Sequence, residues 1–275
     1  MSASRLQNAW IAVAAGLALW LATGVAARAE VLRTGGTGAV YQTLRRLGSA
    51  FMKIEPGISI EIVEGLGSSG GIAATADGAI DFSISGRPLR AAEENLLKAS
   101  VFARTPYGLA TTHPNPGDVR SVEIADMYGS ATSVWPDGTP VRLVLRPRSD
   151  SDADLLVSSF PNMHAAVEKA RLRTEIPVAP TDQDNAAVAE KLGGALTAMT
   201  LAQLQTENLQ MRFLSIDGVG QTLESFESGR YPYGKTFYLV VRSRTTPALD
   251  RLLGFLNSVE GEKVLRANGS LPVRP

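Results

Sequence analysis

Hydrophobic and polar positions change their spacing several times along the first part of the chain. Residues 40–54 carry apolar side chains every three or four positions, which predicts an amphipathic helix that ends at Pro56-Gly57. Residues 58–63 alternate apolar and polar side chains, which predicts a strand, and shorter strands are expected at 31–34 and 79–85. Strands that alternate with helices in this order predict a parallel sheet covered by helices.

Two breaks rich in proline and glycine interrupt the later pattern, at residues 113–117 and 231–234. An apolar strand at 237–241 follows the second break, so we expect the chain to leave one lobe and later return to it. The expected division is lobe 1 at 30–112 plus 236–275, and lobe 2 at 113–235. A strand is also expected at 107–112, and helices at 91–98, 121–128, 221–228, 247–258 and 262–267. Two further helices are expected, one capped by Asp150 or Ser151 and one that begins at Asp184.

Residues 65–71 read GLGSSGG and directly follow the strand at 58–63. A strand that runs into glycines and serines, and then into a short helix near 72–77, directs unpaired N–H groups and two hydroxyls at one small volume. Such a volume suits an anion. A second glycine turn, at 35–38, follows the preceding strand. Because neighbouring turns at the carboxyl ends of parallel strands meet at one crevice, we expect the two turns to form a single site.

The same glycines allow two other interpretations. Residues 65–70 match the dinucleotide fingerprint G-x-G-x-x-G, which would make the chain an NAD-binding oxidoreductase. That site needs a long crossover helix and an acidic residue about 20 positions on, whereas Asp77-Gly78 interrupts the helix and Asp81 comes too early. The other alternative is a flexible glycine-serine turn with no ligand.

Arg146 and Arg148 stand at the end of a predicted strand, just before a helix start. They are either a solvated basic pair or the source of one guanidinium that binds an oxyanion with two parallel hydrogen bonds. His113 and His164 are isolated and lack the spacing of metal ligands, so we interpret both as structural. The sequence predicts no metal, no cofactor and no catalytic set of residues.

Composition narrows the function classes. The chain has 27 basic and 27 acidic residues and few aromatic ones, which argues against nucleic acid as the main partner. It has no cysteine, which excludes thiolate metal sites and cysteine nucleophiles. Residues 1–29 are typical of an export signal, with Arg5 before an apolar run and Ala27-Arg28-Ala29 as the cleavage site. A retained membrane anchor is the alternative, and a periplasmic location is expected either way.

Several short motifs are spread along the chain beyond residue 30. They are Gly36-Thr37-Gly38, Gly67-Ser68-Ser69-Gly70-Gly71-Ile72, Ile80-Asp81-Phe82-Ser83-Ile84-Ser85, Arg87-Pro88-Leu89, Ile124-Ala125-Asp126-Met127-Tyr128-Gly129, Arg146-Pro147, Gly229-Arg230-Tyr231-Pro232 and Gly269-Ser270-Leu271-Pro272. Together, and in this order, they resemble the periplasmic phosphate-binding proteins of ABC transporters, and the resemblance extends over nearly all the chain beyond residue 30. It implies a type II periplasmic-binding-protein fold, an α/β protein of two lobes with mixed, mostly parallel sheets and helices on both faces.

The resemblance implies a function without chemistry: capture of a small oxyanion, most often phosphate, in the cleft between the lobes. The expected partner is an ABC transporter permease or a periplasmic sensor domain, and the expected state is a monomer. An accessory protein that binds no solute is a further possibility. The site residues carried over are Thr37 and Gly38 from the first turn, Ser68, Ser69 and Gly70 from the second, and Arg146 with Asp150 from lobe 2.

The chain departs from the family pattern at two places. Many members have an aspartate after the serine of the strand at 79–85, where it accepts the proton of hydrogen phosphate, but this chain has Gly86. The family's Ser-Gly-Thr donors after the arginine are replaced by residues 149–152, Ser-Asp-Ser-Asp. Asp150 or Asp184 could substitute for the missing carboxylate from lobe 2. Strict selectivity for phosphate does not follow from this sequence.

Overall fold

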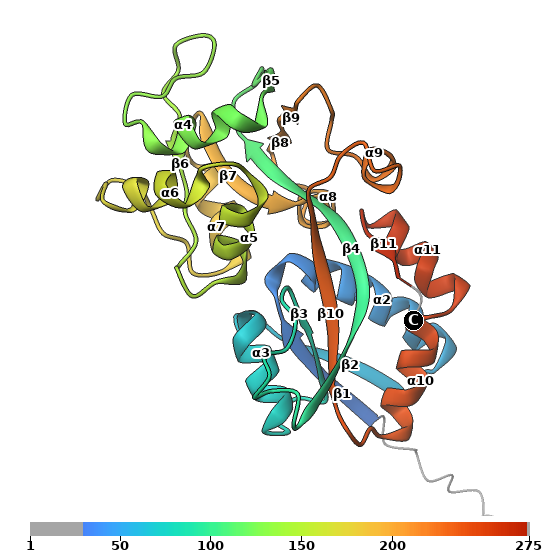
Figure 1. Ribbon diagram of the computed structural model, residues 1–275. Helices are drawn as coiled ribbons and strands as arrows, with labels where there is room; N and C mark the ends of the chain where they lie inside the picture. Colours follow the sequence, from blue (N-terminus) through green and yellow to red (C-terminus); the bar gives the residue numbers. More distant parts are fainter. Residues whose placement is uncertain (1–29, 274–275) are drawn as a thin grey trace, which may run out of the picture.

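Two lobes joined by two long strands make up the computed structural model, which describes residues 30–273 (Figure 1). Strands β4 (Leu97–Thr111) and β10 (Gly234–Arg242) run side by side from one lobe toward the other. The predicted export signal at 1–29 lies outside the described residues. Within 30–273, no helix has the length and apolar character needed to cross a bilayer.

Lobe 1, the lower lobe in Figure 1, is a sheet with helices on both faces. Its strands lie in the order β2-β1-β3-β10-β4. Along β10, Phe237 and Leu239 join the core under one group of helices, whereas Val240 joins Ile72 of α3 on the opposite face. The remaining elements are β1 (Glu30–Gly36), β2 (Ile58–Val63), β3 (Phe82–Ser85) and β11 (Leu271–Pro272), the 3-10 turn η1 (Gly38–Val40), and helices α2 (Tyr41–Ile54), α3 (Gly67–Ala76), α10 (Pro247–Leu256) and α11 (Val259–Ala267).

Lobe 2 has a separate core that includes the buried side chains of Tyr107, Tyr128 and Trp135. The second half of β4 pairs with β7 (Ala195–Thr200), which pairs in turn with β6 (Arg142–Leu143). The other elements are β5 (Asp118–Val119), β8 (Arg212–Phe213), β9 (Ser215–Ile216), η2 (Ser121–Glu123), α4 (Ile124–Gly129), α5 (Ser151–Ser159), α6 (Met163–Arg171), α7 (Asp182–Glu190), α8 (Leu201–Thr206) and α9 (Leu223–Glu227).

The α/β fold, the two lobes and a mixed sheet are confirmed. The purely parallel sheet expected from the order of the first strands is corrected, and so are two local predictions. The main sheet is mixed, because β4 and β10 pair antiparallel at its centre while its parallel strand pairs are β1-β2, β1-β3 and β6-β7. Residues 91–96 form turns instead of a helix, and β4 starts at Leu97. Helix α3 begins inside the glycine-serine stretch, at Gly67. The lobe boundaries at 112 and 235 stay a prediction.

The two glycine turns of lobe 1 are in direct contact. A Cβ atom added to Gly71 of α3 would lie 2.7 Å from the Cα of Gly36, at the end of β1. A Cβ at Gly36 would collide with the carbonyl oxygen of Ile84, and its φ of 123° also favours glycine. Glycine at both positions therefore lets α3 approach β1 closely enough to bring the two turns together.

We predict that Gly71→Ala causes a net destabilisation of up to about 2 kcal/mol, because the added methyl forces α3 away from β1 at a cost of about 1–3 kcal/mol. The gain in helix propensity, about 1 kcal/mol, offsets only part of this loss. The matched control is Gly254→Ala in α10, where a Cβ meets nothing within 4 Å and where the same gain should stabilise the protein. Chemical denaturation measures both effects. Equal stabilisation of the two variants would contradict the close approach.

Candidate functional site

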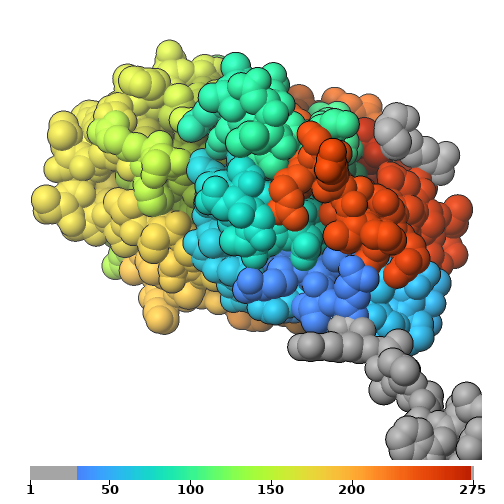
Figure 2. All heavy atoms as spheres, turned by 90° about the horizontal axis from the view of Figure 1, so that it is seen from below, coloured from blue at the N-terminus to red at the C-terminus, as the bar shows by residue number. Residues whose placement is uncertain are grey.

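A cavity of about 490 Å³ lies where the two lobes face each other. Figure 2 shows the yellow segments of lobe 2 directly against the cyan segment of lobe 1. From lobe 1, the lining comes from Gly38, Tyr41, residues 65–69 and Arg90, and from lobe 2, it comes from residues 146–151, Asp154 and residues 180–183.

Helix starts from both lobes surround this cavity, but only those of lobe 2 are capped by their own side chains. The side chain of Asp150 accepts a hydrogen bond from the Asp152 N–H at the start of α5, and the side chain of Thr181 accepts one from the Asp184 N–H at the start of α7. In lobe 1, η1, α2 and α3 begin without any side-chain cap. The first N–H groups of a helix have no partner within it, so an uncapped start such as that of α3 offers donors and a partial positive charge at the cavity wall.

The start of α3 matches the prediction for the second turn in part. Gly67, Ser68 and Ser69 line the cavity, whereas Gly70 is not part of its lining. The hydroxyl of Ser68 accepts a hydrogen bond from the Gly86 N–H at 2.9 Å and lies 3.2 Å from the hydroxyl of Ser151 in lobe 2. Ser69 is exposed, and its hydroxyl accepts from Arg87 at 3.2 Å. The start of α3 therefore forms part of the cavity wall.

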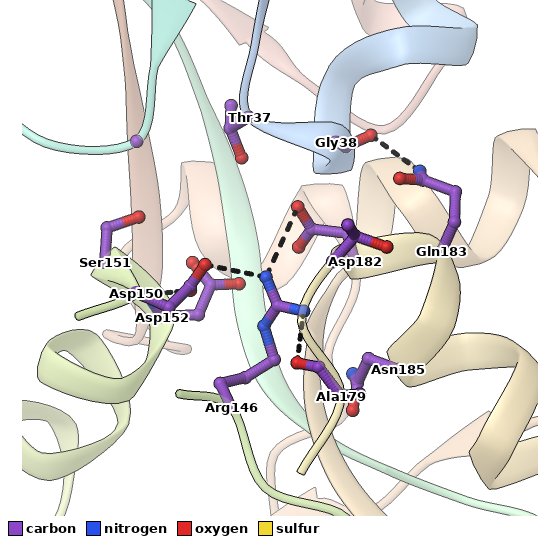
Figure 3. A network of polar contacts seen from close by, with 12 residues as sticks. Thr37, Gly38, Arg146, Asp150, Ser151, Asp152, Ala179, Asp182, Gln183 and Asn185 are labelled. Atoms are coloured by element: carbon purple, nitrogen blue, oxygen red, sulfur yellow. Dashed lines mark hydrogen bonds and ion pairs between the residues drawn. The ribbon is translucent and has the colours of Figure 1, made fainter. Parts of the chain in front are cut away.

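The first turn is engaged by the protein itself. The N–H of Thr37 donates to the carbonyl of Ile84 at 2.9 Å. The carbonyl of Gly38 accepts from the side chain of Gln183 in lobe 2 at 3.0 Å, and a Cβ at Gly38 would lie 2.9 Å from a carboxylate oxygen of Asp182. Figure 3 shows Asp182 between Gly38 and Arg146. Side chains of lobe 2 thus fill the space next to this turn.

Lys235 is a central residue that the sequence analysis missed. Its side chain is 1% exposed, forms an ion pair with Asp152 and donates to the Thr37 hydroxyl at 3.3 Å. A Cβ at Gly86 would lie 2.5 Å from Cε of Lys235, so the lysine occupies the position that an aspartate side chain would take there. In the sequence, the sign of this role was the position of Lys235 two residues before the apolar strand at 237–241. A lysine so close to a buried strand can itself be buried only if it has a charged partner.

Arg146 is buried and held by protein groups. Its guanidinium donates to the Ala179 carbonyl at 3.0 Å and to the Asp150 carboxylate at 2.7 Å, and it lies 3.9 Å from Asp182. Its Nε has no hydrogen-bond partner. Arg148, in contrast, is 64% exposed at the cavity wall and pairs with Glu168 at the surface. The exposed Arg90 also lines the cavity.

Asp152 and Asp182 are the other two residues that the sequence analysis missed. Burial, together with Asp182 and Asp150, raises the pKa of Asp152 to about 6, although Lys235 opposes the shift. Burial also acts to raise the pKa of Asp182, but Lys235, Arg146, Asp152 and the Ala39 N–H outweigh it and lower that pKa. For Lys235, burial acts to lower the pKa, and the two aspartates raise it. Asp152 is therefore the carboxylate of this cluster that takes up a proton as the pH falls to about 6, whereas Asp182 stays charged.

The predicted substitutes for the missing family aspartate have other contacts. Asp150 caps α5 and pairs with Arg146. Asp184 is bonded to Thr181 and does not line the cavity. Of the two histidines, His113 is buried and stacked on Trp135, with its Nε2 3.0 Å from Asp137. Within residues 30–273, no group of three or more histidine, aspartate and glutamate residues could hold a metal ion.

The model of the PBP superfamily domain matches residues 22–260. The chain belongs to the PBP superfamily. No curated protein matches it in sequence.

Solved structures agree with this PBP fold. A candidate phosphate ABC transporter substrate-binding protein with bound phosphate from Clostridium perfringens aligns with a TM-score of 0.76 and 21% identity, over 89% of this chain and all of the other. A phosphate-binding protein from Stenotrophomonas maltophilia aligns at 0.66 and 14% identity, over 89% and 91%. A reduced form of OxyR from N. meningitidis aligns at 0.60 and 12% identity, over 89% and 99%. One fold thus serves different proteins, and the ligand must be argued from the site.

The raised pKa of Asp152 predicts how stability changes with pH. Between about pH 4 and pH 6 the folded protein keeps a proton on Asp152 that the unfolded chain releases, so the free energy of unfolding should fall as the pH rises through this range. Asp152→Asn should remove this fall, whereas Asp154→Asn, at an exposed position of the same helix, should retain it. Denaturation at a series of pH values tests this. Parallel curves for wild type and Asp152→Asn would contradict the assignment.

Proposed function

We propose that this PBP-superfamily protein is an exported solute-binding protein that captures a small oxyanion, with phosphate as the first candidate, in the cleft between its lobes. The observation that carries the proposal is the uncapped start of α3 on the wall of the 490 Å³ cavity. The bound phosphate of the Clostridium perfringens structure supports the same ligand class. The proposed partner is an ABC transporter permease or a periplasmic sensor domain, and the proposed location is the periplasm.

The anion is assigned to the N–H groups of Ser68 and Ser69 at the start of α3, with the Ser69 hydroxyl beside them. Gly70 lies outside the cavity lining and stays a predicted contact. A helix start binds an anion through unpaired N–H groups and through its dipole. Arg148 and Arg90, both exposed on the cavity lining, provide positive charge near the cleft. Arg146 stays a predicted contact through its unpaired Nε, and Asp150 acts by holding that arginine in place. Thr37 and Gly38, predicted from the first turn, stay a prediction, and they are not among the contacts of the anion at α3, because lobe 2 side chains lie against that turn.

The donor count indicates modest affinity. Hydrogen bonds to a charged group contribute about 1.5–3 kcal/mol each, so four of them contribute roughly 6–12 kcal/mol. Lost translational and rotational freedom costs about 4 kcal/mol or more. The net value of about 2–8 kcal/mol reaches micromolar affinity only at its upper end. Binding is therefore expected to be weaker than in a cleft where both glycine turns hold the anion.

A binding function without chemistry fits the site better than an oxidoreductase does. Helix α3 begins at the second glycine of the dinucleotide fingerprint and ends at Ala76, and the residue in mid-fingerprint, Ser68, contacts lobe 2. A dinucleotide needs that helix start and the adjoining crevice for its pyrophosphate. The carboxylates of Asp150, Asp152 and Asp182 are held by cations of the protein and by hydrogen bonds, so none of these three is a free base at the α3 start.

The central variant is Ser69→Asp, which places a carboxylate at the start of α3. We predict that it lowers phosphate affinity at least tenfold, because a negative charge at the helix start competes with the anion. The matched control is Ser69→Asn, which has the same shape without the charge and should bind within about threefold of wild type. Titration calorimetry with inorganic phosphate, sulfate, arsenate and molybdate measures the affinities.

Two results would contradict this assignment. If the Ser69→Asp and Ser69→Asn variants bind phosphate with equal affinity, the assignment of the anion to the start of α3 is wrong. No heat with any of the four anions in the wild-type protein would instead favour an accessory protein without a solute.

A further inference from the structure

The carboxylate of Asp182 is placed where the sequence predicted an oxyanion. It lies against the first glycine turn, with Oδ2 2.9 Å from the position of a Cβ on Gly38. It also lies 3.9 Å from the guanidinium of Arg146, which is the arginine expected to hold the solute. Asp182 is 6% exposed, and it belongs to lobe 2, whereas the turn that it contacts belongs to lobe 1. A carboxylate and a phosphate use the same donors at a helix start.

Lys235 and Asp152 complete this arrangement. The ammonium group pairs with Asp152 of lobe 2 and donates to the Thr37 hydroxyl of lobe 1. Gln183, next to Asp182, bonds the Gly38 carbonyl at 3.0 Å. Two cations, Arg146 and Lys235, are thus shared among the three carboxylates of Asp150, Asp152 and Asp182. A fully ionised cluster would carry a net charge of −1, which repels a second anion placed beside it.

We propose that Asp182 is a built-in substitute for an oxyanion at the first glycine turn. It closes that half of the cleft to solute and leaves only the start of α3 open. The inference deepens the proposed function and rests on it in one respect, the presence of an oxyanion at α3. Asp182 then determines specificity, because it disfavours ligands with a high negative charge and holds the lobes together without any solute. Removing its charge should open the first turn to an external anion.

Calorimetry on Asp182→Asn tests the charge. We expect inorganic phosphate to bind this variant at least tenfold more tightly than it binds wild type, since repulsion falls while the donors remain. The control is Asp184→Asn, on the first turn of the same helix but outside the cavity lining, which should bind like wild type. Unchanged or weaker phosphate binding by Asp182→Asn, with binding by the wild type intact, would overturn the inference and leave the proposed function standing.

A second variant keeps the test decisive when the wild type binds no phosphate. Asp182→Ala removes the carboxylate from the first turn. Acetate at millimolar concentration should bind in its place, and it should raise the melting temperature of this variant by several degrees more than that of wild type. Such rescue would support the inference even where the proposed function fails. The absence of any extra shift with acetate or phosphate would overturn it.

A measurement on the wild type covers the case in which both variants fold poorly. In an NMR titration with inorganic phosphate, the amide signals of Ser69 and Gly70 should move, and the amide signal of Ala39 at the first turn should not. Movement of the Ala39 signal as large as that of Ser69 would show that phosphate reaches the first turn. That result would contradict the role given to Asp182.

Discussion

A buried ammonium group at the junction of the lobes is the constraint on which the rest of the structure depends. Removing an unpaired charge from water costs many kcal/mol, so a buried lysine requires carboxylate partners. Lys235, at the start of β10, finds them in Asp152 and Asp182 of lobe 2. Pairing with Lys235 therefore holds the starts of α5 and α7 against lobe 1, next to the cavity between the lobes.

The same constraint explains the departure from the family pattern at Gly86. An aspartate side chain there would collide with Lys235, because even a Cβ lies only 2.5 Å from its Cε. The acidic group of this chain comes instead from the opposite lobe, and it is paired within the protein. When carboxylates of the protein occupy part of the site in this way, the PBP fold is kept, but the charge of the ligands that fit the cleft changes. Ligand selectivity in such a fold is set by a few charged side chains.

Local patterns predicted the elements that carry the site. The alternation at 58–63 predicted β2, and the glycine-serine stretch predicted an open helix start. Of the two residues expected as the cap of the next helix, Asp150 and Ser151, Asp150 is the one that caps α5. These predictions succeed because alternation and capping depend on residues close together in the sequence. The contact of the two glycine turns, through Gly71, also agrees with the prediction from strand order.

The charged cluster could not be predicted in the same way. Lys235 pairs with a residue 83 positions earlier, and no local pattern records such a pairing. Asp182 lay before the helix expected from Asp184 and carried no local signal, and only the approach of lobe 2 places it at Gly38. The helix expected at 91–98 was wrong for a related reason, because pairing of Leu97 and Lys98 with β10 outweighs their local preference. Predictions fail here wherever a partner from the other end of the chain decides the outcome.

Charged side chains of the protein itself connect the two lobes, and we propose that they hold the lobes together without a bound solute. The distance between the lobes tests this proposal directly. The chain has no cysteine, so cysteines introduced at Leu172 in lobe 2 and Val259 in lobe 1, which are 82% and 65% exposed, can be spin-labelled uniquely. Pulsed electron paramagnetic resonance then measures the distance between the lobes. We predict one narrow distance distribution that is the same with and without millimolar phosphate. A broad distribution that narrows and shortens only when phosphate is added would contradict the claim.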